Sequence, residues 1–568
     1  MKKLYLKSLK YWMISCATLL MSSCNDLNLN PLSEGSSSSW YSTEEEIAMS
    51  VNDLFRDVFW PMDDNQWTDD YIRRESLVPI TNGSITSEWS DNAARWLNQY
   101  RAIGRANTLL SNFTRMEGKI AVATLERYEG VIRFARASNY AYLIARWGDV
   151  PYYTEPLSLD EAFQMGRTSK AEILKHIYED YDYAVAHLPE SYGSNTAQYP
   201  TKGAALAMKA RIALYMEDWS TAKTAAEACM NLGVYELHAD FPSLFLVSTK
   251  NAEESVFLLP RSIAFGVSVF VQWEVPLTLG GWNGAGPSWE LFCSFLCTDG
   301  KPIDESSLFD PRNPFKNRDP RCAYTCVEFQ TEHLGVMYQP HPDSLQILNF
   351  NTGQYQLNND TRANNQYASY NGIALKKGMD EDWTKNSYNI DPDKIIIRYA
   401  DVLLIYAEAK IELGETDESV LHAINRVRAR AYGVDVSATD RYPAVTTMNQ
   451  AELRKALRIE RRMEFAFENL RYMDLIRWRL AEKALNKPRY GMLDVAELRE
   501  KVVKPGLWFF PETPSIDDDG IANFDSMYDK GLIKRLTVLI FDKSKQYLWP
   551  IPSKDILINS NLSQNEGY

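Results

Sequence analysis

Residues 201–235 read TKGAALAMKARIALYMEDWSTAKTAAEACMNLGVY and contain two runs in which apolar residues recur with a helical period. The two-residue turn Glu217-Asp218 separates the runs, and Gly233 has the position of a C-terminal cap for the second run. Small side chains fall on the inner face of each run: Ala207, Ala210, Ala222 and Ala226. Because alanine lets two helices approach closely, the stretch predicts a tightly packed helical hairpin.

The same arrangement occurs in other parts of the chain. Residues 397–433 predict two helices that are joined by a short turn and that each end at a glycine. Residues 125–151 have helical periodicity, and a capping box at Ser169 and Glu172 begins another helix that Pro189 ends. Helix-turn-helix units of about 34 residues with small residues at the contacts are typical of tetratricopeptide-type repeats. We therefore predict a mainly α fold with at least three helix pairs as its scaffold.

Between residues 234 and 395 the composition changes to Gly, Pro, Asn, Asp and aromatic residues, as in GGWNGAGPSW at 280–289. Such a composition predicts loops and short strands, and a long insertion on a helical scaffold is a common place for a ligand site. We divide the mature chain into an N-terminal helical region, an irregular ligand-facing insertion, a further helix pair with the C-terminal helices, and an irregular C-terminal segment: 41–233, 234–395, 396–482 and 483–568.

The first 40 residues predict an export signal and a tether. Four lysines precede an apolar run at 11–21, which is shorter than the roughly 20 residues that span a bilayer. The run leads through Ser22 and Ser23 into Cys24, and LMSSC is similar to a bacterial lipobox. This resemblance implies a signal peptide at 1–23, acylation of the Cys24 thiol and an acylated tether at 24–40. An ordinary cleaved signal with an incidental cysteine is the alternative.

Composition excludes one class of partner. The chain of 568 residues has a formal net charge of −14, and the loss of the four lysines in residues 1–23 makes this −18. Nucleic-acid binding depends on clustered Lys and Arg, so we expect no nucleic-acid partner. No second apolar run of spanning length occurs, so the body is expected to be soluble.

Five cysteines follow the signal segment: Cys229, Cys293, Cys297, Cys322 and Cys326. Four of them form two pairs at i, i+4, which permits a four-cysteine zinc site or a disulfide such as Cys297 with Cys322. Unpaired thiols that are buried as small apolar side chains are the default interpretation.

Several motifs together resemble the SusD/RagB family of outer-membrane lipoproteins of Bacteroidetes-type bacteria. They are, in chain order, CNDLNLNPLSE at 24–34, FARASNYAYLIARWGDVPYY at 134–153, YPTKGAALAMKARIALYMEDWSTA at 199–222, NRDPRC at 317–322, IIIRYADVLLIYAEAKIELGE at 395–415, ERRMEFAFENLRYMDLIRW at 460–478 and YLWPIPSKDILINSNLSQNEGY at 547–568. The resemblance implies four tetratricopeptide-like helix pairs, an irregular ligand-facing subdomain and a lipid anchor in the outer membrane. It also implies a lid over a SusC-like TonB-dependent transporter that captures glycans or, in some members, peptides.

Aromatic residues beside Asn and Asp are the candidates for glycan binding, because sugars offer C–H faces to rings and hydroxyls to amides and carboxylates. Such clusters occur in WPMDDNQWTDDYIRR at 60–74, NGSITSEWSDNAARW at 82–96 and LGGWNGAGPSWE at 279–290. We predict stacking by Trp67, Trp89 and Trp282, and Trp282 between glycines is the best exposed candidate. The remaining candidates are hydrogen bonding by Asn92 and Asn283 and the loop aromatics Tyr338 and Tyr367. For any single tryptophan, burial in the core is the competing interpretation.

Catalytic patterns are weak in this sequence. Three carboxylates at i, i+4 and i+8 are interleaved with arginines, which predicts an ion network on a helix face rather than the acid and base of a glycosidase: Glu460, Glu464 and Glu468 with Arg461, Arg462 and Arg471. The segment IDDDG at 516–520 predicts a turn, with a nonstandard calcium site left open. No HExxH, GxSxG or GxxxxGK[ST] pattern occurs.

The sequence therefore predicts a lipid-anchored protein on the cell surface that binds an oligosaccharide without catalysis or cofactor and delivers it to a SusC-like transporter. The alternatives are a peptide-capturing member of the same family, a surface glycoside hydrolase, and a scaffold that only contacts its transporter.

Overall fold

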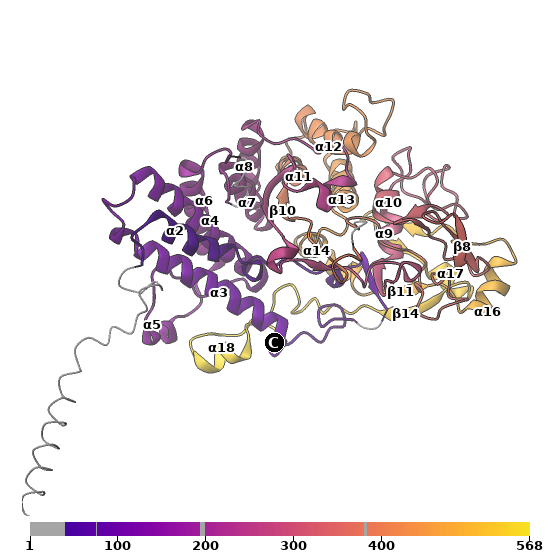
Figure 1. Cartoon of the computed structure of the whole chain (residues 1–568), viewed down its shortest axis with the longest axis horizontal. Helices are drawn as coiled ribbons and strands as arrows, with labels where there is room; N and C mark the ends of the chain where they lie inside the picture. The colour runs from indigo at the N-terminus through magenta and orange to yellow at the C-terminus, as the bar shows by residue number, and fades with distance from the viewer. Residues whose placement is uncertain (1–39, 75–76, 194–198, 380–382) are drawn as a thin grey trace, which may run out of the picture.

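The computed structural model of the chain describes residues 40–74, 77–193, 199–379 and 383–568. Long helices fill one half of the molecule and irregular chain with short strands fills the other (Figure 1). The long helices are α2 (Glu44–Asn52), α3 (Ser90–Ser111), α4 (Val122–Trp147), α6 (Lys170–His187), α7 (Lys202–Tyr215), α8 (Trp219–Asn231), α11 (Tyr399–Glu412), α12 (Glu418–Ala431) and α13 (Gln450–Glu464). The predicted mainly α scaffold is confirmed.

The helix pairs occur where the sequence predicts them. α7 and α8 pack against each other with their alanine faces buried, and Glu217 in the turn between them has a φ of 61°. Side chains cap the N-termini of two of these helices: Thr201 accepts a hydrogen bond from a backbone N–H in the first turn of α7, and Ser169 does the same for α6. α4 packs against α6, α11 packs against α12, and α11 also packs against α8. Chain segments about 170 residues apart are therefore neighbours in one continuous scaffold.

The strands are short and all of the named pairings are antiparallel. Pairs form between β1 (Tyr71–Arg73) and β4 (Ala285–Pro287), β2 (Ser255–Leu259) and β10 (Lys394–Arg398), β3 (Val269–Phe270) and β9 (Asn389–Ile390), β11 (Pro488–Gly491) and β14 (Lys534–Val538), and β12 (Ser515–Ile516) and β13 (Ala522–Asn523). One four-stranded sheet contains β5 (Glu332–His333), β6 (Val336–Met337), β7 (Gln346–Asn349) and β8 (Gln354–Leu357).

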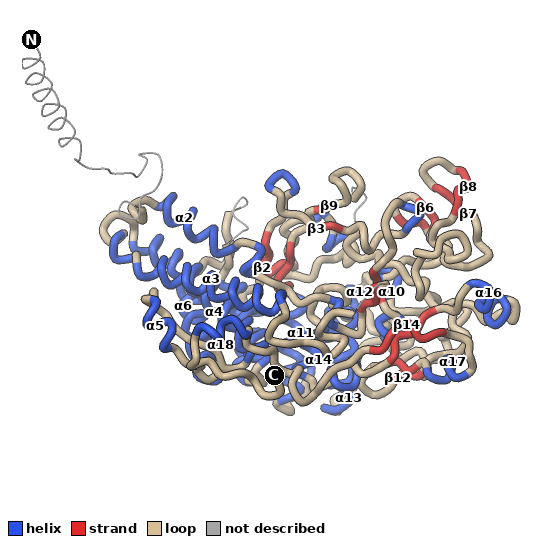
Figure 2. The backbone as a smooth tube through the Cα atoms, turned by 90° about the horizontal axis from the view of Figure 1, so that it is seen from below, coloured by secondary structure: helices blue, strands red, loops and turns tan. Residues whose placement is uncertain are grey.

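The short helices are α5 (Leu159–Gln164), α9 (Trp289–Ser294), α10 (Pro320–Thr325), α14 (Arg471–Arg477), α15 (Ala481–Ala484), α16 (Val495–Leu498), α17 (Asp525–Asp529) and α18 (Ser553–Ile558). Seen from below, the chain around β3, β9, β6, β7 and β8 rises along one edge of the molecule (Figure 2). Short strands and helices thus occupy the region for which the sequence predicts them; the exact domain boundaries stay a prediction.

The end of the chain returns to the helical half. Trp549 is 1% exposed inside the helical core, where its indole N–H donates to the Tyr472 hydroxyl at 2.9 Å. Next to it, the Trp147 indole N–H donates to the Asn92 side-chain oxygen at 3.0 Å and to the Pro550 carbonyl at 3.1 Å. The irregular C-terminal segment therefore completes the core of the N-terminal helices.

The carboxylates of α13 form a buried network and not the predicted helix-face network. Glu460 and Glu464 are both 0% exposed, and Glu468 lies beyond the end of α13. Their partners come from other elements: Arg321 of α10, Arg398 of β10, Arg428 and Arg430 of α12, and Lys377. The interleaved arginines point elsewhere and pair with Asp69, Asp70, Asp401 and Asp474. The prediction was wrong about the partners because α10, α12 and β10 cover the face of α13 that carries the glutamates.

All five cysteines after the signal segment are buried free thiols, so the Cys297–Cys322 disulfide is absent from the structure. The IDDDG segment forms the turn between β12 and β13, and Lys483 pairs with Asp517 at 2.9 Å and with Asp519 at 2.5 Å. Within the described ranges, no group of His, Cys, Asp and Glu has the arrangement of a metal site. None of the helices described is long and apolar enough to cross a membrane. Cys24 and most of the predicted tether lie outside the described residues.

Candidate ligand-binding site

Three predicted site residues lie in or against the helical core. The Trp67 ring is 2% exposed and packs edge-on against Trp549, with 5.2 Å between ring centroids. Asn92 is 0% exposed and donates to the Pro550 carbonyl at 2.9 Å, while Trp89 is half-buried 5.4 Å from Trp549. Stacking by Trp67 and ligand binding by Asn92 are therefore wrong, because residues 549–550 cover both side chains.

Two further predicted residues are buried in the irregular half. Tyr338 is 1% exposed and donates its hydroxyl to the Gly372 carbonyl at 3.0 Å, so it is a core residue and its prediction is wrong. Asn283 is 5% exposed, so its side chain lies beneath the surface of the loop. Direct hydrogen bonding of a ligand by Asn283 is therefore also contradicted.

Trp282 differs from all of these because its side chain is 38% exposed. Its ring lies nearly perpendicular to that of Trp273, with 4.7 Å between centroids, and 5.7 Å from Phe270. Phe270 and Tyr367 are 43% and 54% exposed. These rings, together with Arg73 and Arg74, are called the Trp282 cluster below.

A tight glycine-rich turn holds Trp282 at the surface. The Trp282 N–H donates to the Gln272 carbonyl at 2.7 Å, and the Gly284 N–H donates to the Trp273 carbonyl at 2.9 Å. A Cβ at Gly281 would lie 2.1 Å from the Val275 carbonyl oxygen, so only glycine fits there. Since residues 281–284 lie directly on residues 272–275, the Trp282 side chain has no room inside and projects outward.

Paired strands bring the other members to this turn. β1 pairs with β4 and places Arg73 opposite Ala285, while β3 pairs with β9 and positions Phe270. The Arg73 guanidinium lies over the Trp273 ring at 4.4 Å. The Arg74 guanidinium lies over the Tyr367 ring at 5.2 Å and donates to the carbonyls of Trp282 and Tyr367. Arg74 therefore joins two loops that are distant in sequence.

One carboxyl group lies beside the cluster. Burial raises the pKa of Glu274 to about 7, while the positive charge of Arg73 acts in the opposite direction. Near neutral pH this carboxyl group is therefore only partly ionised.

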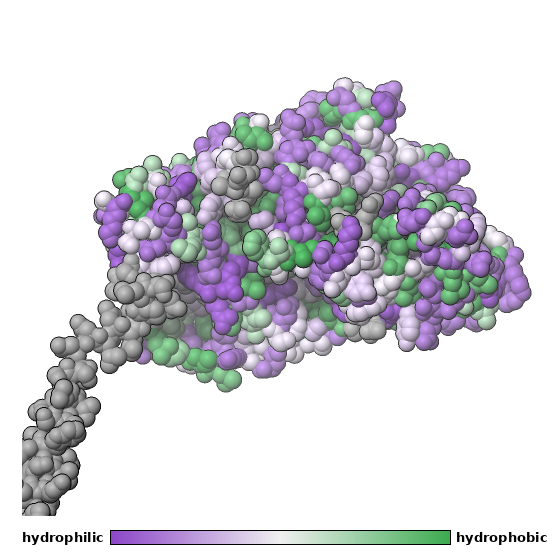
Figure 3. Space-filling model, viewed as in Figure 1, coloured by the Kyte–Doolittle hydropathy of each residue, from purple (hydrophilic) through white to green (hydrophobic). Residues whose placement is uncertain are grey.

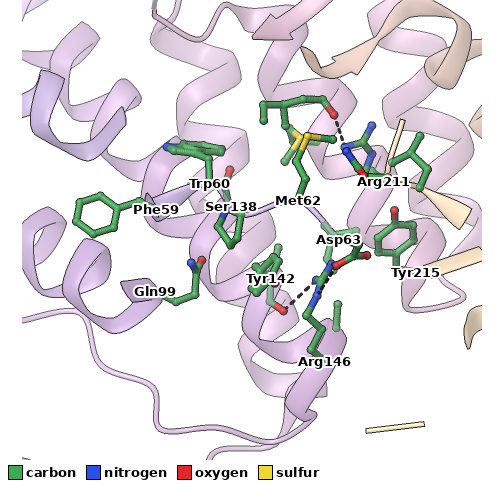
Figure 4. Close-up of a pocket in the computed structure, with 18 residues that line it drawn as sticks. Phe59, Trp60, Met62, Asp63, Gln99, Ser138, Tyr142, Arg146, Arg211 and Tyr215 are labelled. Atoms are coloured by element: carbon green, nitrogen blue, oxygen red, sulfur yellow. Dashed lines mark hydrogen bonds and ion pairs between the residues drawn. The ribbon is translucent and has the colours of Figure 1, made fainter. Parts of the chain in front are cut away.

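An internal cavity and an apolar surface patch are less suited to an oligosaccharide than the Trp282 cluster. A cavity of about 110 Å³ lies among the helices, and Trp60, Tyr142 and Tyr215 line it together with the ion pair of Asp63 and Arg146 at 2.5 Å (Figure 4). Ligand pockets usually measure about 300–1,000 Å³, so this cavity holds water or a very small molecule.

Exposed apolar side chains also gather over α5 and α18, at the lower left of Figure 3. Leu159, Leu557 and Ile558 are 69%, 86% and 55% exposed. This α5–α18 patch is mainly aliphatic and offers few rings for a sugar. A groove of about 470 Å³ beside it is lined by Tyr100, Tyr153, Phe163 and Asn559, but Phe163 is its one ring among the exposed large hydrophobic side chains that the structure describes. The Trp282 cluster instead brings together three rings that are 38–54% exposed, beside polar groups.

Comparisons with known proteins establish the relationship. Residues 266–568 match the model of the SusD family, and residues 38–214 match a family described as starch-binding associating with outer membrane. The chain belongs to the SusD family. The resemblance inferred from the motifs is confirmed.

Relatives within the SusD family cover most of the chain. SusD-like protein P25 of Formosa agariphila is 28% identical over 420 residues, which are 71% of this chain and 74% of that protein. SusD-like protein P2 of the same organism is 24% identical and covers 99% of this chain and 100% of its own length. The crystal structure of a SusD-like carbohydrate binding protein from Bacteroides fragilis has a TM-score of 0.73 at 25% identity, over 92% of this chain and 99% of that one.

Sequence reasoning found Trp282 and considered Tyr367, but it missed Phe270, Trp273 and the two arginines. Arg73 and Arg74 end the same segment from which Trp67 was selected. An arginine pair after a short strand was the available signal, but only the strand pairing shows that it meets the glycine-rich loop.

Proposed function

We propose that this protein binds an oligosaccharide at the Trp282 cluster without cleaving it. The exposed Trp282 ring, flanked by the exposed rings of Phe270 and Tyr367, carries the proposal. Flat apolar rings match the C–H faces of pyranoses, and the neighbouring guanidinium groups match their hydroxyls. The carbohydrate-binding relative from Bacteroides fragilis supports the same ligand class.

The carboxylates support binding rather than hydrolysis. Glycosidases place two carboxyl groups about 5–9.5 Å apart across a sugar-sized cleft. Glu460 and Glu464 are buried and held by arginines, so neither reaches a substrate. Glu274 has a raised pKa, as a catalytic acid does, and this one observation favours testing hydrolysis as the second candidate.

The location at the cell surface is part of the same proposal. The LMSSC segment supports acylation at Cys24, and the match of residues 38–214 to a family described as associating with the outer membrane supports the site of anchoring. A SusC-like transporter then receives the captured oligosaccharide, and its proximity raises the local concentration of ligand at the pore. Mass spectrometry of the mature N-terminus and copurification of a transporter test these two steps.

A glycan array probed with residues 25–568 tests the binding function, with a peptide library screened in parallel. We expect binding to a restricted set of glycans and recovery of those glycans at unchanged length. Binding to peptides alone would favour the peptide-capturing alternative. Shortened products would favour a hydrolase, and no binding to either library would favour a scaffold role.

A further inference from the structure

We propose that the Trp282 cluster selects acidic oligosaccharides, with Arg73 and Arg74 binding the anionic substituents of the glycan, which are uronate carboxylates or sulfate esters. This inference rests on the proposed function and names the ligand class of the same site.

The two arginines are held in place by neutral groups. Arg73 donates to the Gln66 side-chain oxygen at 3.1 Å and lies over the Trp273 ring. Arg74 donates to two backbone carbonyls and lies over the Tyr367 ring. Among the described residues, no carboxylate lies within ion-pair distance of either guanidinium. Both side chains are thus oriented without being neutralised.

Many other arginines in this acidic chain form ion pairs. The chain has 75 acidic and 61 basic residues, so carboxylates are in excess. Arg462 pairs with Asp70 at 2.6 Å, Arg471 pairs with Asp69 at 3.0 Å, and Arg398 pairs with Glu464 at 2.6 Å. Other arginines without an ion pair, such as Arg318 and Arg489, are buried and donate to backbone carbonyls, whereas Arg73 and Arg74 are adjacent and lie at a partly exposed aromatic surface.

The nearest acidic groups leave this positive charge largely in place. Burial raises the pKa of Glu274 to about 7, so near neutral pH it carries only part of its negative charge. Asp64 accepts hydrogen bonds from the Gln66 backbone N–H at 2.9 Å and from the Gln66 amide at 3.0 Å. Neither group forms an ion pair with Arg73 or Arg74 among the described contacts.

An anionic sugar fits this arrangement better than a neutral one. Guanidinium groups bind carboxylate and sulfate oxygens through charge-assisted hydrogen bonds, which are about twice as strong as neutral ones. The exposed rings meet the sugar faces, and the arginines that lie over Trp273 and Tyr367 meet substituents at the edges of those faces. The anionic substituent of the ligand then supplies the negative charge that pairs with the Arg73 and Arg74 guanidinium groups.

The test uses two matched pairs of probes with residues 25–568: oligogalacturonate with its carboxyl-reduced form, and a sulfated galactan oligosaccharide with its desulfated form. We expect one acidic member to bind about tenfold or more tightly than its neutral counterpart. This preference should weaken between about 50 and 500 mM salt, because partly exposed charges are screened. The pair that shows it identifies the carboxylate or the sulfate as the ligand group.

Variants assign the preference to the cluster. Arg73→Gln and Arg74→Gln should each lower the affinity for the acidic member about tenfold and lower the affinity for its neutral counterpart by clearly less, because a hydroxyl loses only an uncharged partner while an anionic group loses a charge-assisted hydrogen bond. Arg426→Gln is the matched control, because Arg426 lies over the Tyr399 ring at 5.3 Å on the distant α12. Thermal unfolding of each variant checks the loop structure: an unchanged unfolding temperature shows that weaker binding comes from the lost charge and not from a disrupted loop. Arg73→Gln tests the charge more directly than Arg74→Gln does, because Arg74 also joins two loops through its hydrogen bonds.

Equal binding of the acidic and neutral members, or binding only of neutral glycans on the array, would overturn this inference and leave the proposed function intact. Absence of binding to every probe and every array glycan would instead overturn the proposed function.

Discussion

Two groups of tryptophans occur in the molecule, and they have opposite environments. Trp67, Trp147 and Trp549 are at most 2% exposed, and the rings of Trp67 and Trp147 each pack edge-on against Trp549 with 5.2 Å between centroids. Trp282, beside a half-buried Trp273, projects from a glycine-rich turn at 38% exposure. In the sequence Trp67 stands among Asp and Asn, and Trp282 stands among Gly and Asn. The difference teaches that exposure depends on whether a distant segment returns to cover the ring.

The largest expected effect comes from the buried group. Trp549→Ala should lower the free energy of unfolding by about 3–5 kcal/mol, because it leaves a cavity in the helical core and removes a hydrogen bond to Tyr472. Trp282→Ala, which removes an exposed ring, should lower it by less than about 1 kcal/mol. Chemical denaturation of both variants measures the contrast. Equal losses would show that the two groups do not differ as described.

The same contrast extends to charged residues. Glu464→Gln should destabilise the protein by about 3 kcal/mol or more, because Arg321, Arg398 and Arg430 would lose a shared buried partner. Glu497→Gln is the control, since Glu497 forms an exposed pair with Lys501 and should cost under about 1 kcal/mol. A Glu464→Gln protein as stable as the control would contradict the structural role of the network.

Acid sensitivity should arise from the core. Burial favours the neutral form of Asp401, but the charges of Arg211 and Arg461 outweigh it and lower its pKa to about 2. A carboxyl group with a depressed pKa stabilises the folded state above its unfolded pKa of about 3.9 and loses that contribution as the pH falls. We expect Asp401 to supply about 2 kcal/mol that is lost between about pH 4 and 2. Thermal unfolding at graded pH should show a shallower decline for Asp401→Asn.

Stability should depend on pH in the opposite direction at the site. Because the pKa of Glu274 is raised to about 7, the folded state binds its proton more tightly than the unfolded state does. Its contribution to stability is therefore present below about pH 4.5 and declines as the pH rises to about 7. Glu274→Gln should unfold at a higher temperature than the unmodified protein at pH 8 and show little difference at pH 4. A larger difference at pH 4 would reverse the assigned sign.

The helix pairs could be predicted from the sequence because their signals are local. Alanine spacing, caps and glycine stops are contained within residues 201–235, and the structure has α7 and α8 there. The carboxylate stripe of α13 was also visible, but its partners Arg321 and Arg398 come from distant segments. The sequence of α13 alone does not indicate that α10, α12 and β10 cover the face that carries the glutamates.

In the candidate site, too, local features could be predicted from the sequence and contacts between distant segments could not. The glycines around Trp282 restrict the backbone locally, so an exposed ring could be predicted there. Burial of Trp67 and Asn92 depends on residues 549–550, more than 450 residues later in the chain, and could not be predicted. The approach of Arg74 to Tyr367 likewise depends on contacts between distant loops.

Isothermal titration calorimetry of Trp282→Ala with a glycan identified on the array tests the central claim most directly. Phe163→Ala, which removes a 37% exposed ring from the α5–α18 patch, is the control. We predict that Trp282→Ala weakens binding about tenfold or more at an unchanged unfolding temperature, while Phe163→Ala binds as the unmodified protein does. Unchanged affinity in Trp282→Ala, with a loss in Phe163→Ala, would contradict the account.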